Sequence, residues 1–368
     1  MSFNLEKPVK VISGENAVLN NGERLSRFGK KCLIVTSGTA AEKSGALKEV
    51  IGVLKSNKIS LLVFDSVTQN PKTSECFEAG RIAKRFGADF IVGIGGGSPL
   101  DAAKAVGVYA ANPKISSPDL IYTEPVENKP LPVVLIGTSA GTGSEVTGVS
   151  VLTNTNGKKK SVKGENYYAS LVLADSKYTY SLPYSVTVST ALDALCHAVE
   201  SFLSKKADGL SREYSKKAVS LLWEQLVFLE KEKTLPNERQ RDILYDASLY
   251  AGLAIEKTGC CFPHTVGYFL TEKHAVPHGK ACAVFLPEYV KRGLEFDEEN
   301  AKTILSVMNT DFSSFEKTVM SLADVKICLD EKELENYLPN WENAGNFDNS
   351  PGGFTANQAR DLIIRLFS

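Results

Sequence analysis

Four side chains in the second half of the chain have the types and spacing of a divalent-metal site. Asp193 and His197 stand four residues apart in an apolar stretch, so a helix would present both on one face, one turn apart. His264 and His278 follow later, in a segment rich in Gly and Pro. Three imidazoles and one carboxylate suit Fe²⁺ or Zn²⁺ better than Mg²⁺ or Ca²⁺, which prefer oxygen ligands. The alternative for Asp193 and His197 alone is a hydrogen-bonded pair inside a helical core.

A glycine-rich segment far upstream predicts a phosphate-binding loop. The apolar run at residues 90–94 is typical of a buried parallel strand, and three consecutive glycines follow it at residues 95–97. Ser98 is expected to cap the next helix, with Asp101 near the positive end of the helix dipole. A pyrophosphate would then rest on the free N–H groups of the helix N-terminus. The alternative is a plain strand–turn–helix connection.

A second loop of small residues follows another apolar run at residues 132–136. Here Thr138, Ser139, Thr142 and Ser144 alternate with Ala and Gly. Short hydroxyl side chains offer many hydrogen-bond donors and little bulk, which suits the phosphate, ribose or amide edge of a nucleotide. The alternative for this segment alone is a Gly/Ser/Thr surface loop.

Composition and length describe a typical globular protein and exclude several other classes. The chain has 368 residues, for which two domains are the natural expectation, and its formal net charge is −1. That charge argues against nucleic acid or an anionic membrane as the main partner. No apolar run is long enough for a transmembrane helix, and the N-terminus lacks the pattern of a secretory signal. Seven cysteines without framework spacing indicate reduced thiols, so we expect a cytoplasmic protein.

The pattern of apolar residues changes near the middle of the chain. Apolar strands alternate with helical segments in the first half, which predicts a mainly parallel sheet with helices on both faces. Four of the expected strands lie at residues 32–38, 60–67, 89–97 and 132–139. Ligands of such sheets bind at the carboxyl ends of the strands, where both glycine-containing loops fall.

Long helical patterns dominate after Leu182, with helix starts expected at residues 183–185 and at Asp208. The predicted architecture is therefore an α/β domain over residues 1–180 and an all-α domain over residues 181–368.

Four motifs occurring in order resemble the iron-containing (group III, metal-dependent) alcohol dehydrogenase family. They are GGGSPLDAAKA, GTSAGTGSEVT, ALDALCHAVE and VPHGKA. The resemblance implies a dehydroquinate synthase-like fold, with a Rossmann-like doubly wound N-terminal domain that binds NAD or NADP. It further implies a helical C-terminal domain with one catalytic metal, and an active site in the cleft between the domains. Carried over by motif, the metal ligands are Asp193, His197, His264 and His278.

The resemblance also bears on cofactor choice. NAD-preferring members of the family have an Asp at the position matched by Ser37, and an acidic group there would repel a 2′-phosphate. Ser37 and Gly38 carry no charge, which favours NADP(H) over NAD(H); the alternative is relaxed specificity. The residues expected to lie along the cofactor are Ser37, Asn70, Gly95, Gly96, Gly97, Ser98, Asp101, Thr138, Ser139, Thr142, Ser144 and Lys159.

The implied chemistry is hydride transfer between a nicotinamide and a carbon whose oxygen is bound to the metal. Several relatives have a further His four residues after the third metal ligand, where it helps to transfer the proton. Tyr268 stands there in this chain. Either its hydroxyl takes that role, or a water molecule and the ribose hydroxyls do.

The predicted activity is a metal-dependent alcohol dehydrogenase or aldehyde reductase acting on a short primary alcohol or diol, with Fe²⁺ or alternatively Zn²⁺. Two alternatives use the same scaffold: a dehydroquinate synthase-like lyase and a glycerol dehydrogenase-like polyol oxidoreductase. A third is a non-catalytic metal- and nucleotide-binding protein. The expected partners are a small alcohol or aldehyde and a second copy of the chain, paired through an edge strand near the N-terminus.

Overall fold

The computed structural model describes residues 9–342 and 344–368, which form two compact units. The first unit ends at Leu182 and excludes residues 140–143, while the second contains residues 140–143 together with everything from Pro183 onward. A short segment of the second loop therefore belongs to the helical unit.

The first unit is built on a six-stranded sheet in which every pair of neighbouring strands is parallel. The strand order is β1–β8–β5–β4–β2–β3. Strands β4 and β5 are buried along their whole length because helices cover both faces of the sheet. The strands are β1 (Val11–Ser13), β2 (Lys31–Thr36), β3 (Ser60–Phe64), β4 (Phe90–Gly95), β5 (Val133–Gly137) and β8 (Leu171–Ala174).

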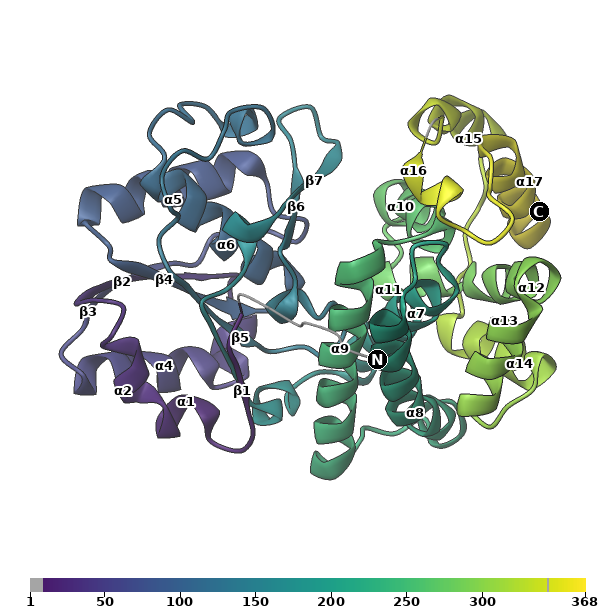
Figure 1. Ribbon diagram of the computed structural model, residues 1–368, viewed down its shortest axis with the longest axis horizontal. Helices are drawn as coiled ribbons and strands as arrows, with labels where there is room; N and C mark the ends of the chain where they lie inside the picture. The colour runs from purple at the N-terminus through teal and green to yellow at the C-terminus, as the bar shows by residue number, and fades with distance from the viewer. Residues whose placement is uncertain (1–8, 343) are drawn as a thin grey trace. The chain divides into compact units, whose positions relative to one another are not determined.

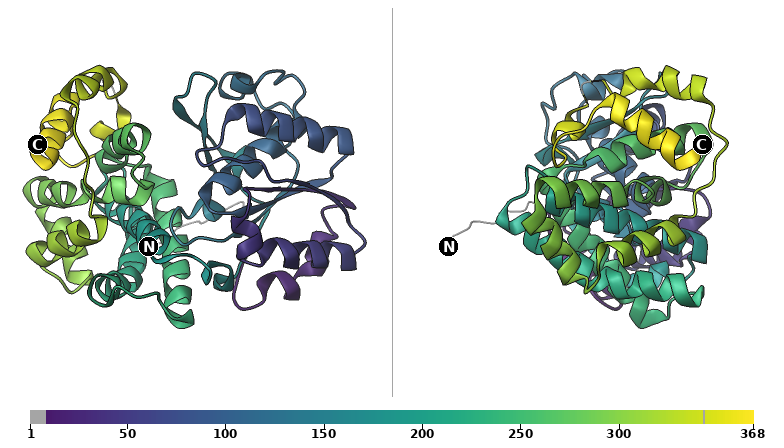
Figure 2. Two further views of the ribbon diagram at one scale, coloured as in Figure 1. Left: turned by 180° about the vertical axis from the view of Figure 1, so that it is seen from behind. Right: turned by 90° about the vertical axis from the view of Figure 1, so that its right-hand side faces the viewer.

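Helices lie on the two faces of this sheet, as Figure 1 shows: α5 and α6 cover one face, and α1 and α4 cover the other. The view from behind in Figure 2 gives the same arrangement. Apolar side chains of α1 and α4, such as Val18 and Leu54, join the main core beneath the sheet. The helices are α1 (Ala17–Asn20), α2 (Gly22–Leu25), α3 (Ala40–Lys43), α4 (Ala46–Ser56), α5 (Thr73–Phe86) and α6 (Gly97–Ala111).

A hairpin leaves the sheet after the second glycine-containing loop. Strands β6 (Val149–Thr153) and β7 (Lys159–Lys163) pair antiparallel, with Thr153 opposite Lys159. Gly157, with φ of 78°, lies in the connecting turn, where a left-handed residue suits a tight hairpin.

The second unit is helical throughout the described residues. Its central helix, α7, is buried over most of its length, and α8, α9 and α11 pack against it. The longer helices are α7 (Tyr184–Leu203), α8 (Gly209–Glu232), α9 (Glu238–Thr258), α10 (Phe262–His274), α12 (Leu286–Phe296), α13 (Glu298–Val307), α14 (Phe312–Ala323) and α17 (Ala356–Phe367). The shorter ones are α11 (His278–Ala283), α15 (Glu331–Tyr337) and α16 (Gly345–Asp348).

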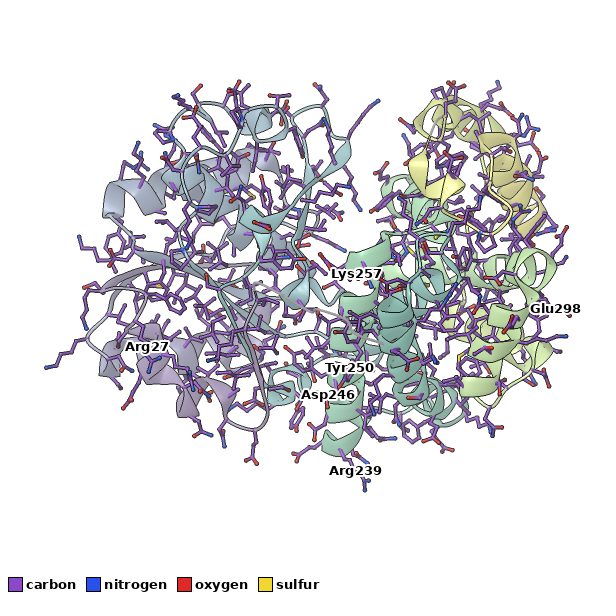
Figure 3. All side chains as sticks on the ribbon, viewed as in Figure 1. Arg27, Arg239, Asp246, Tyr250, Lys257 and Glu298 are labelled. Carbon is purple, nitrogen blue, oxygen red and sulfur yellow. The ribbon has the colours of Figure 1, made fainter. Side chains whose placement is uncertain are left out.

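Helix α9 packs against both α7 and α8. Figure 3 labels Arg239, Asp246, Tyr250 and Lys257 along its length. The ring of Tyr250 lies 6.4 Å from that of Tyr214 on α8, between ring centroids. Asn237 caps α9 by accepting a hydrogen bond from the backbone N–H of Gln240, which satisfies one of the free donors at the helix start.

The predicted fold class is confirmed, including the parallel sheet and the helical second half. Helix α7 begins at Tyr184 and α8 has Asp208 as its N-cap, as the sequence predicts. The prediction that Ser98 caps the helix after the glycines is wrong. Helix α6 begins at Gly97 with Gly96 as its N-cap, because the glycine backbone itself makes the turn. In the described residues, no helix is long and apolar enough to span a membrane.

Candidate metal centre and dinucleotide loop

Three ionisable side chains lie on one face of helix α7. Asp193, His197 and Glu200 follow at intervals of four and three residues, so they succeed one another along the same stripe. All three are buried, although charged groups at such depth are stable only with partners. Glu200 was not among the residues predicted from the sequence, yet its helical spacing from Asp193 and His197 could have revealed it.

The two later histidines reach this stripe from the starts of α10 and α11. His264 lies in the first turn of α10, and His278 is the first residue of α11. Gly279 lets α11 approach α7, because a Cβ atom there would lie 1.8 Å from the carbonyl oxygen of Ser189 and 2.9 Å from Asp193 Cβ. No larger residue fits this crossing without a backbone shift. The glycine thereby holds His278 close to the Asp193 carboxylate.

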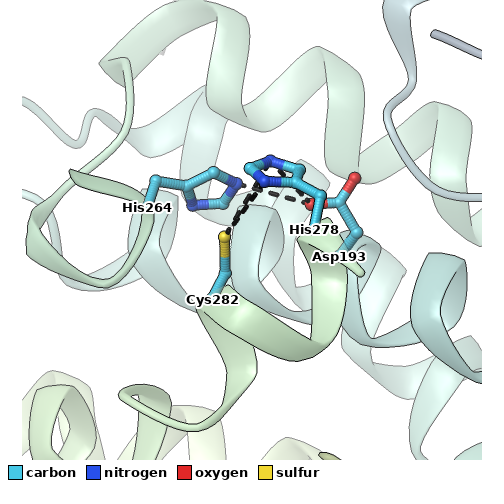
Figure 4. Close-up of side chains that lie close together, drawn as sticks. All are labelled: Asp193, His264, His278 and Cys282. Carbon is cyan, nitrogen blue, oxygen red and sulfur yellow. Dashed lines mark hydrogen bonds and ion pairs between the residues drawn. The ribbon is translucent and has the colours of Figure 1, made fainter. Parts of the chain in front are cut away.

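Donor atoms of four side chains converge at one point, as Figure 4 shows. Asp193, His264, His278 and Cys282 each offer one ligand atom, and these atoms all lie within 4.8 Å of one another. Asp193 Oδ1 is 3.5 Å from His264 Nε2 and 3.7 Å from His278 Nε2. The structure thus brings three of the four predicted metal ligands together, and it adds a cysteine that the sequence did not indicate.

The fourth predicted ligand, His197, lies beside this group. Its ring stacks on that of His264, with 4.6 Å between centroids and 11° between planes. With His264 and Cys260 it forms a second set of donor atoms within the same 4.8 Å limit. The backbone of Gly141, in the short segment that belongs to this unit, hydrogen-bonds the His197 ring.

Several polar atoms of the cluster are buried without a hydrogen-bond partner. They are Asp193 Oδ1, His264 Nε2 and His197 Nδ1. An unsatisfied buried polar atom costs about 1–3 kcal/mol, and more for a charged one, so three together need an explanation. The atoms are nitrogen and carboxylate oxygen, the donors that Fe²⁺ and Zn²⁺ accept. The residues therefore fit a divalent transition metal.

Electrostatics at the cluster favour a negative carboxylate surrounded by imidazoles. Burial acts to raise the pKa of Asp193, but its interactions with His197, His264 and His278 hold that pKa below its usual range. Burial lowers the pKa of His197, which keeps its ring neutral and leaves a lone pair available. Burial also acts to lower the pKa of His264, but Cys260, Cys282 and Glu200 raise it well above the usual value. A cation would have to displace a proton from that ring.

Glu200 fixes the orientation of His264. Its Oε1 lies 2.5 Å from His264 Nδ1, and its Oε2 accepts a hydrogen bond of 2.6 Å from the backbone N–H of Cys261. With Nδ1 bound to the carboxylate, His264 directs Nε2 toward Asp193. Metal-binding histidines commonly bond a carboxylate through the second ring nitrogen in this way.

Tyr268 and His274 lie farther along α10 than His264. The Tyr268 ring stacks on that of His278 at 5.7 Å between centroids and 14° between planes. Burial raises the pKa of its hydroxyl, so the phenol stays protonated at neutral pH. His274 ends α10, where its ring contacts Phe269 edge to face at 5.3 Å.

The predicted phosphate loop joins β4 to α6 at the carboxyl end of the sheet. Gly95 has a φ of 149°, and a Cβ atom there would lie 2.6 Å from Pro99 Cγ, so a glycine is required. Thr138 is buried and donates its backbone N–H to the Gly95 carbonyl at 2.9 Å, which joins the first loop to the second. A Cβ atom on Gly96 would lie 3.0 Å from Ser139 Oγ, so Ser139 borders the same loop. Gly97 follows as the first residue of α6.

Three further predicted cofactor residues meet beside this loop. Asn70, in a left-handed conformation with φ of 58°, donates its backbone N–H to Ser98 Oγ at 3.2 Å. Its carbonyl accepts a hydrogen bond of 3.2 Å from the hydroxyl of Thr153, the residue opposite Lys159 in the hairpin. Residues that are far apart in the sequence thus surround the start of α6.

Asp101 and Ser144 belong to an internal network of the first unit. Ser144 Oγ donates to Asp101 Oδ1 at 2.5 Å, and the backbone N–H of Val151 donates to Asp101 Oδ2 at 2.9 Å. Lys104 is fully buried next to them, donating to Ser144 Oγ at 2.8 Å and to the Val149 carbonyl at 2.7 Å. Because both carboxylate oxygens of Asp101 accept hydrogen bonds from these residues, the contacts hold α6 against the second loop and the hairpin.

Ser37 and Thr142 complete the set of predicted cofactor residues. Ser37 follows β2 and forms an isolated bridge with Ser66, while the next amide, of Gly38, donates to the carbonyl of Asp65 at 2.9 Å. No acidic side chain occupies position 37 itself. Thr142 lies in residues 140–143, which group with the helical unit.

Two features of this chain are typical of oxidoreductases that use a metal and a dinucleotide. One is the parallel sheet with its glycine-rich turn, and the other is the helical unit with its histidine–carboxylate cluster. Comparison with protein families supports this class of enzyme. Residues 8–176 match the model described as iron-containing alcohol dehydrogenase, and residues 187–330 match that of the family's C-terminal domain. The chain belongs to the iron-containing alcohol dehydrogenase family.

Individual relatives are similar over most of the chain. The 1,3-propanediol dehydrogenase of Klebsiella pneumoniae is 33% identical over 306 residues, which cover 82% of this chain and 78% of the relative. The sulfoacetaldehyde reductase of Bilophila wadsworthia is 32% identical over 318 residues, covering 85% and 81%. The solved structure of an iron-containing alcohol dehydrogenase from Thermotoga maritima is 32% identical, with a TM-score of 0.90 and 99% of each chain covered. The chain is accordingly an oxidoreductase of a family that acts on alcohols and diols with a metal and NAD(H) or NADP(H).

Proposed function

We propose that this chain is a metal-dependent alcohol dehydrogenase or aldehyde reductase that uses NADP(H) in preference to NAD(H) on a short primary alcohol, diol or corresponding aldehyde. The first unit binds the dinucleotide and the second holds Fe²⁺, with Zn²⁺ as the alternative metal. The observation that carries the proposal is the group of buried donor atoms without hydrogen-bond partners around Asp193. A purely structural cluster would have its polar atoms paired.

The residues that would hold the metal are Asp193, His264 and His278, together with the neighbouring His197. A divalent ion bound there supplies a Lewis acid for the oxygen of an alcohol or aldehyde. Asp193 contributes a negative charge, because its pKa is held low by the imidazoles around it. Glu200 holds the His264 ring in a fixed orientation, and Gly279 keeps α11 close to α7. The chain's own contribution is a preorganised set of donors that needs little rearrangement.

For the cofactor, we propose that the backbone amides of Gly96, Gly97 and Ser98 bind the pyrophosphate at the start of α6. Thr138, Ser139 and Lys159 would border it, as would Asn70, whose amide already contacts Ser98. The preference for NADP(H) rests on the lack of an acidic side chain at Ser37, which leaves room for a 2′-phosphate.

We propose that Tyr268 holds the proton that the substrate oxygen loses or gains. Its ring stacks on that of His278, which lies in the donor group. Because burial raises the pKa of the phenol, Tyr268 stays neutral: it can donate its proton to the substrate oxygen, and it can accept one only while releasing its own to a neighbouring group. A chain of hydroxyl groups and water can then pass the proton to solvent.

The exposed edge of the sheet supports a homodimer. Strand β1 lies at one end of the strand order and Val11 is 39% exposed there, so a second copy could pair along this edge. Light scattering on the purified protein measures the mass directly, and a monomer would contradict this part of the proposal.

The activity is tested by the oxidation of NADPH and of NADH, without oxygen, on a panel of short aldehydes with Fe²⁺ or Zn²⁺ restored. A chelator-treated sample is the control. We expect turnover that depends on the metal and favours NADPH. If one metal binds per chain and no aldehyde is reduced, the dehydrogenase proposal fails, and a dehydroquinate synthase-like lyase activity becomes the alternative to assay.

A further inference from the structure

A buried turn near the C-terminal end of the chain lies beside the start of helix α10. Asn349 and Ser350 follow α16, beyond residue 330, where the match to the family's C-terminal model ends. Both side chains are buried, and α16 packs against α10 (Figure 1). Phe354, a little further along, stacks on Phe262, the first residue of α10, with 3.9 Å between ring centroids. The C-terminal segment thus contacts α10 where that helix begins.

Asn349 connects α7 to the segment between α9 and α10. Its side-chain amide donates hydrogen bonds to the carbonyls of Thr258 and Cys260, at 3.1 and 3.2 Å. Its Oδ1 accepts a hydrogen bond of 2.7 Å from the hydroxyl of Ser204, and its carbonyl accepts one of 3.0 Å from the backbone N–H of Lys205. Ser204 is the C-cap of α7, and Thr258 is the last residue of α9. One buried side chain therefore ties the end of α7 to the segment that leads into α10.

Ser350 supplies a cap that α10 lacks in its own sequence. Cys261 is the N-cap of α10, but its side chain makes no capping hydrogen bond. Ser350 Oγ instead accepts a hydrogen bond of 3.0 Å from the backbone N–H of Phe262 and donates one of 2.9 Å to the carbonyl of Asn346. The preceding amide, of Cys261, donates to Glu200 at 2.6 Å. Two backbone donors at the start of α10 are thus satisfied by distant segments.

The helices that this turn joins carry three of the four predicted metal ligands. Asp193 and His197 lie on α7, and His264 lies in the first turn of α10. Ligands on separate helices bind one ion only if the helices hold a fixed spacing, because metal–ligand distances tolerate only a few tenths of an ångström. We propose that the Asn349–Ser350 turn positions the metal centre, by fixing the start of α10 relative to the end of α7. This inference rests on the proposed metal centre and leaves its four ligands unchanged.

Zinc affinity tests the inference on the full-length protein, by competition with a chromophoric chelator. Asn349→Asp keeps the shape of the side chain but turns a carboxylate oxygen toward the two carbonyls. We expect the affinity for Zn²⁺ to fall by about 10–100-fold, as when an outer partner of a metal site is lost. Ser350→Ala removes only the capping hydroxyl, so it should weaken zinc binding by about fivefold, the equivalent of roughly 1 kcal/mol for a lost cap.

Asn112 offers a matched control in the first unit. Like Asn349 it is buried, and its amide donates to two carbonyls, of Val108 at 2.9 Å and of Asn128 at 3.1 Å. Its Oδ1 also accepts a hydrogen bond, of 2.8 Å, from the backbone N–H of Asn128. Asn112→Asp should lower the free energy of unfolding of the metal-free protein as Asn349→Asp does, but leave zinc affinity unchanged. Equal loss of affinity in these two variants would overturn the inference, and so would wild-type affinity in both variants of the turn.

Hydrogen exchange of the wild-type protein gives a second readout, which decides even if a variant fails to fold. Coupling between two sites is reciprocal, so zinc bound at the centre must stabilise the turn that positions it. The amides of residues 345–353 should exchange more slowly with Zn²⁺ bound, while those of residues 108–116, around Asn112, should not change. Exchange that zinc leaves unchanged in the turn, or slows equally in both segments, would contradict the inference.

Neither measurement requires turnover, so the two proposals fail separately. An inactive protein whose zinc affinity depends on Asn349 contradicts only the dehydrogenase activity. An active protein whose zinc affinity is the same with and without the Asn349 amide contradicts only the role of the turn. A protein that binds no zinc contradicts both.

Discussion

Two buried clusters of charged residues differ in how their polar atoms are satisfied. In the first unit, Asp101 and Lys104 lie 3.5 Å apart, and Ser144, Val149 and Val151 supply further hydrogen bonds to them. In the second unit, three donor atoms around Asp193 are buried without a hydrogen-bond partner, although Asp193 Oδ1 lies 3.5 Å from His264 Nε2. The imidazoles stabilise the charge of Asp193, but only the first cluster has all of its charged atoms hydrogen-bonded within the chain. The difference indicates that the first cluster holds the fold together and that the second binds something from outside.

The largest effect is expected from removing the carboxylate of the unsatisfied cluster. Asp193→Asn keeps the shape of the side chain and removes the negative charge that attracts the metal ion. We expect loss of bound metal and a fall in kcat/KM of about a thousandfold or more, which corresponds to roughly 4 kcal/mol. Metal analysis and steady-state kinetics measure both. A variant that keeps its metal and its rate would show that the cluster is not the centre.

A substitution in the hydrogen-bonded cluster of the first unit should lower the stability of the protein and leave metal binding unchanged. Lys104→Met leaves Asp101 buried without its cation, so the free energy of unfolding should fall by about 3–5 kcal/mol. Denaturant unfolding measures this change. Because Lys104 lies in the other unit, metal content should stay unchanged. A variant as stable as the wild type would contradict a structural role for the network.

A substitution at Glu200 is expected to have an intermediate effect on metal affinity. Glu200→Gln removes the charge that orients His264 but keeps the side-chain volume. We expect metal affinity to fall by about 10–100-fold, as is typical for the outer partner of a metal-binding histidine. Competition with a chromophoric chelator measures the affinity. Unchanged affinity would mean that the contact of 2.5 Å between Glu200 and His264 serves only to pack α7 against α10.

The smallest effect is expected from Ser37, which bears on the preference between NADPH and NADH. Ser37→Asp adds a negative charge where a 2′-phosphate would lie, so the preference should move from NADPH toward NADH. We expect the ratio of the two kcat/KM values to change by about tenfold, or roughly 1.4 kcal/mol. Ser37→Asn is the uncharged control. A ratio that both variants leave unchanged would place the 2′-phosphate elsewhere.

The sequence predicted the parts of the fold that follow from local pattern. The buried strands β4 and β5 and the starts of α7 and α8 were correct because apolar periodicity and caps are local properties. Strand β8 was missed, since it is only four residues long and has no distinctive flanks. The cap of α6 was wrong because a glycine turn makes a serine cap unnecessary.

The candidate site could be predicted only in part, because much of it depends on contacts between distant segments. The sequence indicated Asp193, His264 and His278 through residue type and resemblance, and the structure brings them together. Cys282 was not recognised, since its nearness to Asp193 depends on the crossing of α11 over α7 at Gly279. Asp101 was predicted to lie along the cofactor, and sequence pattern could not reveal that Ser144 and Val151 donate hydrogen bonds to its two carboxylate oxygens.

The most direct test of the central claim is a titration of metal-free protein with Fe²⁺, without oxygen, followed by aldehyde-dependent oxidation of NADPH. Activity should rise in proportion to added metal and level off at one ion per chain, and Asp193→Asn should give no activity at any metal concentration. Full activity in the metal-free protein, or a plateau reached equally by Asp193→Asn, would contradict the assignment of the unsatisfied cluster as the catalytic metal centre.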